Sequence, residues 1–203
     1  MKNPKKLIYG RLPGFGLDKR GLVQVEKLAE AFKSIKLDIA YISPLLRSRQ
    51  TVKALKEYQP KLKIRKSDDL LEVDNKIWEG KVWTERDPEL VKIYKNTPTK
   101  LKVKGLESVF DVEKRVARVI DKIIKEYKDK GGHIAIISHA DPIRIATLHY
   151  KKESLDSLHE KMCTNASINT LVFNGGKLVK SDYREIYPRA DESYWTKTNK
   201  QLA

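Results

Sequence analysis

The chain has 203 residues, of which 40% are hydrophobic and 34% are charged, a balance typical of one soluble globular domain. No apolar run approaches the ~20 residues that a membrane-spanning helix needs, and no signal peptide opens the sequence, so we expect a cytoplasmic protein without a membrane partner. The single cysteine, Cys163, excludes an internal disulfide and a zinc site built from several cysteines.

The net charge of +15 is the unusual bulk property of the sequence. A polyanion such as nucleic acid would be one explanation. The lysines are scattered along the whole chain, however, and no segment interleaves basic and aromatic residues as single-strand-binding surfaces do. A small phosphorylated substrate explains the charge as well, so we expect that partner rather than nucleic acid; the sequence leaves the oligomeric state open.

The first third of the chain predicts a loop, a helix, a strand and a second helix. Residues 1–17 hold three glycines and two prolines and predict an irregular loop. From Asp18 apolar residues recur at helical spacing to about residue 35, and the segment 37–42 then predicts a strand. Ser43-Pro44 follows as a cap and a first-turn proline, which opens a helix that ends near Tyr58.

The middle of the chain predicts a short strand, a short helix and a long helix. The strand is expected at 62–64 and the short helix around 85–95. Ser108 then caps the long helix, with Asp111 three residues later in a weaker form of the capping box. Gly131-Gly132 ends this helix.

The segment 133–150 is the centre of the sequence pattern. The apolar run 134–137 predicts a strand buried on both faces, and Pro142 suits the first turn of the helix that follows. Between them lies Ser138-His139-Ala140-Asp141, at the carboxyl end of a strand, where α/β sheets bind ligands and where a helix N-terminus favours anions. His139 is therefore a candidate for phosphate chemistry; the alternative is a turn histidine bonded to nearby backbone.

A second strand–turn–helix unit, 37–58, places Arg47 in the first turn of its helix. If the two strands are parallel neighbours, Arg47 and His139 converge on one anion site, because the carboxyl ends of parallel strands meet at the same edge. The alternative for Arg47 is an ordinary solvated surface residue.

The carboxyl-terminal part predicts a short helix near 153–160 and a β-hairpin. The strands at 168–173 and 178–186 are joined by Asn174-Gly175-Gly176, a sequence typical of a hairpin turn. We expect one domain over residues 1–187 and a loosely held tail over 188–203.

Several short motifs occur in an order and spacing that is specific as a set. They are Gly10-Arg11-Leu12-Pro13-Gly14, the run from Ser43 to Thr51, Leu71-Glu72 with Trp78-Glu79-Gly80, Glu107-Ser108 with Arg115, and Ser138-His139. In these the chain resembles the histidine phosphatase superfamily, also called phosphoglycerate mutase-like, over most of its length. The resemblance implies a three-layer α/β/α sandwich with a mostly parallel mixed sheet.

The resemblance also implies a two-step phosphoryl transfer through a phosphohistidine, without a metal or organic cofactor. Arg47 matches the arginine that clamps the phosphate, and Arg11 and Asn3 lie in a loop that lines the pocket. His139 matches the second histidine around the phosphate, and Glu72 matches the acid that protonates the leaving oxygen.

The sequence departs from the family in one respect. The family's first, central strand ends in Arg-His-Gly and supplies the nucleophile, and this sequence has no such motif. Its histidines are His133, His139, His149 and His159, and the resemblance places the missing one a few residues before Met1. Either Met1 is an internal methionine taken as the start, or the chain begins here and has lost catalysis.

The short segment between Gly80 and Glu107 favours a phosphatase over a mutase, which needs a more enclosed site. The chain itself is expected to be nearly inactive, because it lacks the nucleophile. The alternatives are a phospho-ligand-binding pseudoenzyme, a phosphoglycerate-type mutase and, with least support, a basic nucleic-acid-binding module.

Overall fold

The structure is a computed structural model that describes residues 3 and 5–186, so the predicted tail at 188–203 lies outside the described residues. No helix in this described part is long and apolar enough to cross a membrane. The helices and strands are, in chain order, α1 (Lys19–Ala31), β1 (Ile39–Ile42), α2 (Leu46–Tyr58), β2 (Lys63–Lys66), α3 (Pro88–Asn96), α4 (Val109–Tyr127), β3 (Ile134–Ile137), α5 (Ala140–Lys151), β4 (Ile168–Asn174) and β5 (Lys177–Arg184).

Three short parallel strands form the centre of the fold, in the order β2-β1-β3. In this sheet Ile42 at the end of β1 lies opposite Lys66 of β2 and Ile137 of β3. The predicted parallel pairing of the two strand–turn–helix units is therefore confirmed. The loops that follow β1 and β3 consequently leave the sheet side by side.

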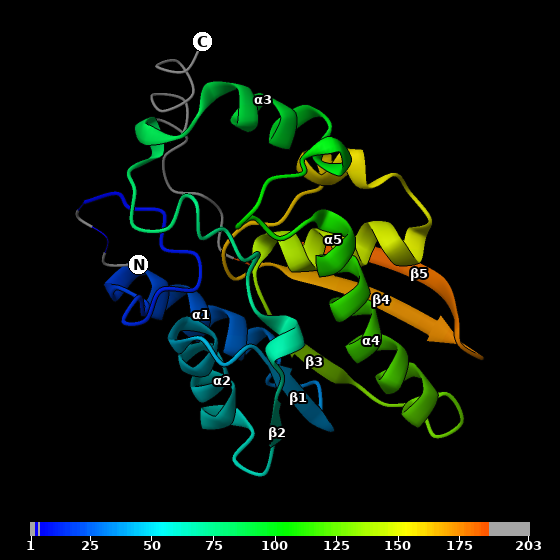
Figure 1. Ribbon diagram of the computed structural model, residues 1–203. Coiled ribbons are helices and arrows are strands. Elements are labelled where there is room, and N and C mark those ends of the chain that lie inside the picture. The colour runs from blue at the N-terminus through cyan, green and yellow to red at the C-terminus, as the bar shows by residue number, and fades with distance from the viewer. Residues whose placement is uncertain (1–2, 4, 187–203) are drawn as a thin grey trace.

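Helices cover both faces of this sheet (Figure 1). Ala40 and Ile42 of β1 pack with α1 and α2, whereas Ile39 and Tyr41 pack with α4. This alternation follows from the two-residue period of a strand. The layers are those of an α/β/α sandwich, as expected.

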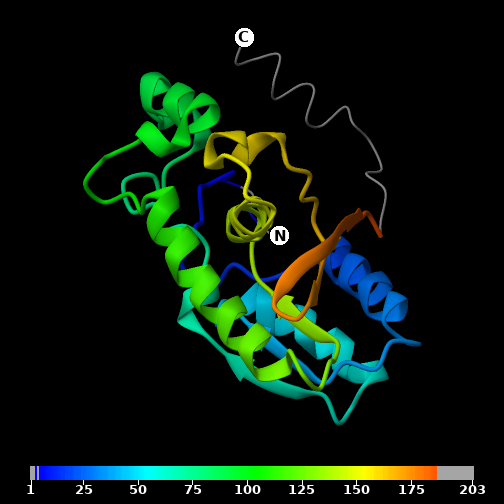
Figure 2. The same cartoon turned by 90° about the vertical axis from the view of Figure 1, so that its right-hand side faces the viewer.

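The remaining two strands form a sheet of their own, the antiparallel hairpin β4–β5, drawn in orange in Figure 2. Gly175 and Gly176 have φ values of 54° and 81°, which the tight hairpin turn requires, so the predicted hairpin is confirmed. Only β1 pairs with β3 in the described part of the chain, so the second edge of β3 carries unpaired backbone groups.

Burial shows the effect of this free edge. All four residues of β1 are buried, but all four of β3 are only half-buried. The prediction that 134–137 is buried on both faces is therefore wrong for the described chain. The prediction of a strand from the apolar run is confirmed. Full burial of a strand needs a paired strand on each side, however, and in the described residues β3 pairs only with β1.

Candidate active site

Arg47 and His139 meet at the carboxyl edge of the parallel sheet. Arg47 is the second residue of α2, and His139 is the cap residue immediately before α5. Arg47 Nε donates a hydrogen bond of 3.0 Å to His139 Nδ1, and the two residues are only 9% and 6% exposed. The expected convergence of these side chains on one site is confirmed.

The loop around Gly10 holds the guanidinium of Arg47 in place. Arg47 Nη2 donates to the Gly10 carbonyl at 3.1 Å, and the guanidinium carbon lies 5.2 Å from the centre of the Tyr9 ring. Gly10 has a φ of 35°, and a Cβ there would overlap the side-chain oxygens of Glu79 and Asn75. Arg47 Nη1 bonds no described residue and remains available to an anion.

Both ring nitrogens of His139 are occupied. Nδ1 accepts from Arg47 Nε, so the ring proton sits on Nε2, which lies 2.8 Å from Ser43 Oγ. Burial, together with the positive charge of Arg47, lowers the pKa of His139 to about 2. His139 is therefore a neutral imidazole near pH 7, with no free lone pair with which to attack phosphorus.

Glu72 follows a 3-10 turn, Asp68–Leu70, at the same edge of the molecule. Its carboxyl group accepts a 3.0 Å hydrogen bond from the backbone N–H of Val73. Burial, reinforced by the negative charge of Asp141, raises the Glu72 pKa to about 7. A carboxyl group with this pKa can donate a proton near neutral pH.

A network of charged side chains fixes the segment that carries Glu72. Arg115 donates to the carbonyls of Asp69, Leu71 and Glu72 at 2.8, 2.7 and 3.2 Å. Arg115 Nε also bonds Glu107 at 2.7 Å. Three backbone carbonyls held by one guanidinium leave this segment little freedom.

Arg11 bonds to this network, whereas Asn3 bonds to the backbone of its own loop. Arg11 bonds the Glu72 carbonyl through Nε, Asp74 through Nη1 and Glu107 through Nη2, at 2.7, 3.3 and 2.9 Å. Both polar atoms of the Asn3 side chain bond the backbone of Leu7. The phosphate-binding role expected for these two residues stays a prediction.

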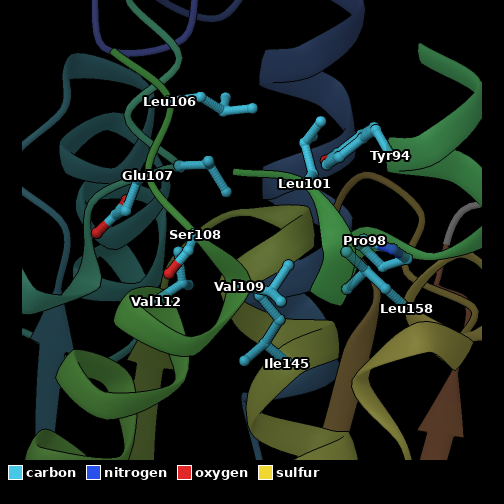
Figure 3. Close-up of a pocket in the computed structure, with 11 residues that line it drawn as sticks. Tyr94, Pro98, Leu101, Leu106, Glu107, Ser108, Val109, Val112, Ile145 and Leu158 are labelled. Carbon is cyan, nitrogen blue, oxygen red and sulfur yellow. The ribbon is translucent and has the colours of Figure 1, made fainter. Parts of the chain in front are cut away.

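A cavity of about 160 Å³ lies beside the site; Glu72 and Gly10 line it, whereas Arg47 and His139 do not. Its walls are mainly apolar, with two carboxyl groups among them; the lining residues include Tyr9, Gly10, Glu72, Trp78, Trp83, Arg86, Tyr94 and Asp141. A second cavity, shown in Figure 3, lies among Leu101, Val109 and Ile145, and its volume of about 10 Å³ has room for at most one water molecule. Only the larger cavity suits a substrate.

A family model for the histidine phosphatase superfamily (branch 1) matches residues 2–185. The chain belongs to this superfamily. It is 27% identical to phosphoserine phosphatase 1 of Hydrogenobacter thermophilus over 158 residues, covering 76% of this chain and 74% of the relative. It is also 27% identical to an uncharacterised protein of Mycobacterium tuberculosis over 193 residues, covering 90% of both chains.

Several solved structures share the fold of this chain. YhfR of Bacillus stearothermophilus superposes with a TM-score of 0.80 at 20% identity, covering 86% of this chain and 87% of that one. The mycobacterial glucosyl-3-phosphoglycerate phosphatase superposes with a TM-score of 0.76 at 19% identity, covering 89% and 90%.

The other histidines of the chain lie away from Arg47. His133 is exposed at the opposite, amino end of β3. His149 lies 2.9 Å from Glu113 on α4, and the His159 ring packs edge-on against Tyr94. In the described residues, therefore, no histidine except His139 contacts Arg47.

Some residues of the site could not be assigned from the sequence. Ser43 was expected to cap a helix, but α2 begins at Leu46 after Leu45, and the buried Ser43 hydroxyl instead lies against His139. Asp141 was noted only as part of the loop, yet its charge acts on Glu72 and it accepts a hydrogen bond from Tyr94. These contacts join segments 47 to 96 residues apart, which local patterns do not report.

The low pKa of His139 predicts that its contribution to stability is lost in acid. The folded pKa of about 2 lies below the ordinary value of 6.5, so the contribution is complete above pH 6.5 and decreases as pH falls through that value. The loss is at most about 1.4 kcal/mol per pH unit. His139→Gln should thus cost less stability at pH 5 than at pH 7.5 in urea unfolding.

The stability of the unaltered protein must be compared with that of the His139→Gln variant, because the ionisation of Glu72 changes stability with pH in the opposite direction. Its pKa is raised, so its contribution declines as pH rises from about 4.5 to about 7. His133→Gln, at the exposed histidine, is the matched control and should leave the pH dependence unchanged. An equal cost of His139→Gln at both pH values would contradict the prediction.

Proposed function

We propose that this protein is a phosphomonoesterase that transfers the phosphoryl group of a small substrate to a histidine and then to water. The observation that carries the proposal is the buried Arg47–His139 pair beside Glu72, at the edge of a cavity of about 160 Å³. Superfamily membership supports phosphoryl transfer, and phosphatases among the relatives support hydrolysis.

In this proposal Arg47 and His139 bind the phosphoryl oxygens. The guanidinium stays positively charged, and its free Nη1 can bond an oxygen whose charge grows in the transition state. For the Nε2–H of His139 to bond a second oxygen, the imidazole ring must rotate away from Ser43, because the direction of this N–H is fixed by the ring. Glu72, protonated to about half at pH 7, gives its proton to the leaving oxygen.

The nucleophile is the part that the described residues do not supply. A parallel strand added to the free edge of β3 would end beside Ser138 and His139, because parallel strands share their carboxyl edge. A histidine at its end would face the phosphate held by Arg47. We therefore propose that such a strand completes the intact enzyme, and that the chain without it is nearly inactive.

A phospho-ligand-binding pseudoenzyme is the second candidate function. It is favoured by one observation, namely that His139 is the only histidine in contact with Arg47 in residues 3 and 5–186.

A mutase would transfer the phosphoryl group to a second substrate instead of water. Both proposals place the protein in the cytoplasm with a small phosphorylated partner rather than nucleic acid.

We expect the chain to bind inorganic phosphate or vanadate through Arg47, whether or not it turns over. Hydrogen bonds to charged groups contribute about 1.5–3 kcal/mol, so Arg47→Gln should weaken binding roughly ten- to a hundredfold in isothermal titration calorimetry. Arg65→Gln removes an arginine that bonds Tyr41 at 2.9 Å on the central sheet and should bind normally. Unchanged binding by a folded Arg47→Gln variant would contradict the proposed site.

A further inference from the structure

Two carboxyl groups face the same cavity beside the phosphate site. Glu72 and Asp141 both line the cavity of about 160 Å³, Glu72 from the segment after the 3-10 turn and Asp141 from the first turn of α5. Neither residue is exposed, and only 14% of the Asp141 side chain is accessible to solvent. Two ionised carboxyl groups in so small a space repel each other, which favours a state in which one of them keeps a proton.

The surroundings of Asp141 favour its charged form. Asp141 Oδ1 accepts a hydrogen bond of 3.1 Å from Arg144 Nη1, and Oδ2 accepts one from the Tyr94 hydroxyl. Arg144 is itself fixed, because its Nε donates to the Lys161 carbonyl at 2.9 Å. A cationic donor, a hydroxyl donor and the N-terminus of a helix all stabilise a carboxylate relative to the uncharged acid.

The surroundings of Glu72 favour its protonated form. In the described part of the chain its carboxyl group bonds only the backbone N–H of Val73, at 3.0 Å, and no lysine or arginine there lies within salt-bridge distance of it. Arg11 and Arg115 bond the backbone carbonyl of Glu72 instead. Of the two carboxyl groups, Glu72 is therefore the one that keeps the proton. Burial, reinforced by the charge of Asp141, accordingly raises the pKa of Glu72 to about 7.

The other ionisable groups around Glu72 are Arg47 on α2, Tyr94 on α3, Arg115 on α4, and Tyr9, Arg86 and Cys163 in loops. The arginines on α2 and α4 lower the pKa of Glu72, but each by less than Asp141 raises it. Burial raises the pKa of both phenols and of the thiol, so these three are neutral near pH 7. Arg86 lies over the Trp83 ring and bonds the Trp83 carbonyl. None of these groups supplies a negative charge that could replace that of Asp141.

We propose that Asp141 is a positioning residue that keeps the leaving-group proton on Glu72. This role rests on the proposed function, since it concerns the acid of that reaction. Asp141 stays ionised between Arg144 and Tyr94 and acts through Glu72 rather than on the reacting atoms. After Glu72 has given its proton to the leaving oxygen, both carboxyl groups are charged. Their repulsion then favours return of a proton to Glu72 from the water molecule that attacks the phosphohistidine.

The test is a carbon-13 NMR titration of residues 1–203, which needs neither ligand nor turnover. Samples labelled at the side-chain carboxyl carbon of glutamate or of aspartate separate the two kinds of signal, and Glu72→Gln and Asp141→Asn identify the two residues. We expect the Glu72 signal to titrate near pH 7 in the unaltered chain. Asp141→Asn removes the charge and keeps the shape of the side chain, so it should lower this midpoint by roughly one pH unit.

Asp121→Asn is the matched control. Asp121 also accepts from a tyrosine hydroxyl, that of Tyr150 at 2.7 Å, but it does not line the cavity, so its replacement should leave the Glu72 midpoint unchanged. An unchanged midpoint in a folded Asp141→Asn variant would refute the role of Asp141. A signal near pH 7 that belongs to Asp141 in the unaltered chain would refute it too, and this comparison does not depend on the folding of any variant.

Phosphate binding separates this role from the proposed function. If Asp141→Asn leaves the Glu72 midpoint unchanged but Arg47→Gln still weakens phosphate binding, the role of Asp141 is refuted and the proposed function stands. If phosphate binding does not depend on Arg47, the proposed function fails whatever the titration shows.

Discussion

A chain extended upstream in frame, so that it carries a strand ending in Arg-His-Gly, should hydrolyse aryl phosphates at an ordinary enzymatic rate, whereas residues 1–203 alone should be nearly inactive. The reason is chemical, because His139 has its Nδ1 lone pair bonded to Arg47 and a proton on Nε2. It therefore has no lone pair to offer to phosphorus. Ordinary turnover is about 1–10³ per second, so the expected difference spans several orders of magnitude.

The measurement compares p-nitrophenyl phosphate hydrolysis by the two chains and traps an acid-labile phosphohistidine in the extended one. Replacing the added histidine by alanine is the control, and it should return the activity to that of the shorter chain. Ordinary turnover by residues 1–203 would show that another residue is the nucleophile. An extended chain that folds and stays inactive would favour the pseudoenzyme.

The extension should also raise stability, because of the free edge of β3. Each buried backbone group left without a partner costs about 1–3 kcal/mol, against a total stability of about 5–15 kcal/mol for a domain. Half-buried isoleucines at this edge also offer a surface for pairing with a second chain. We expect the shorter chain to unfold at lower urea concentration and to aggregate more readily.

The sequence predicted those parts of the site that depend on local pattern and strand direction. Arg47 and His139 each follow a short apolar run that leads into a helix, and parallel pairing of the two runs was enough to bring them together. The α/β/α layers were implied by the resemblance to the superfamily. The burial of β3 could not be predicted in this way, because an apolar run does not say how many neighbours its strand has.

Contacts between distant segments could not be predicted from the sequence, for a different reason. The phosphate-binding role expected for Arg11 stays a prediction, and the sequence did not show that its three side-chain nitrogen atoms bond the Glu72 carbonyl, Asp74 and Glu107, up to 96 residues away. Likewise, nothing in the sequence around Arg86 shows that its guanidinium lies over the rings of Trp78 and Trp83. Such pairings depend on loop conformations that have no periodic pattern.

Glu72→Gln in the extended chain should slow hydrolysis of alkyl phosphates by roughly 10²–10⁴-fold, the usual contribution of a general acid. An alkoxide leaving group needs a proton, and Glu72, with a pKa of about 7, is the acid beside the cavity. p-Nitrophenolate is stable without protonation, so the loss on p-nitrophenyl phosphate should be much smaller. Parallel measurement of kcat/KM for 3-phosphoglycerate and p-nitrophenyl phosphate gives the comparison.

The pH profile provides a second signature of the same group. Because the reaction needs the protonated carboxyl group, kcat/KM for the alkyl ester should fall about tenfold per unit above pH 7. Glu72→Gln cannot titrate and should lose this alkaline limb. Glu113→Gln, which alters a carboxylate paired with His149 away from the cavity, is the control and should keep it. Equal losses on both esters, with the alkaline limb retained, would make Glu72 a structural residue rather than the acid.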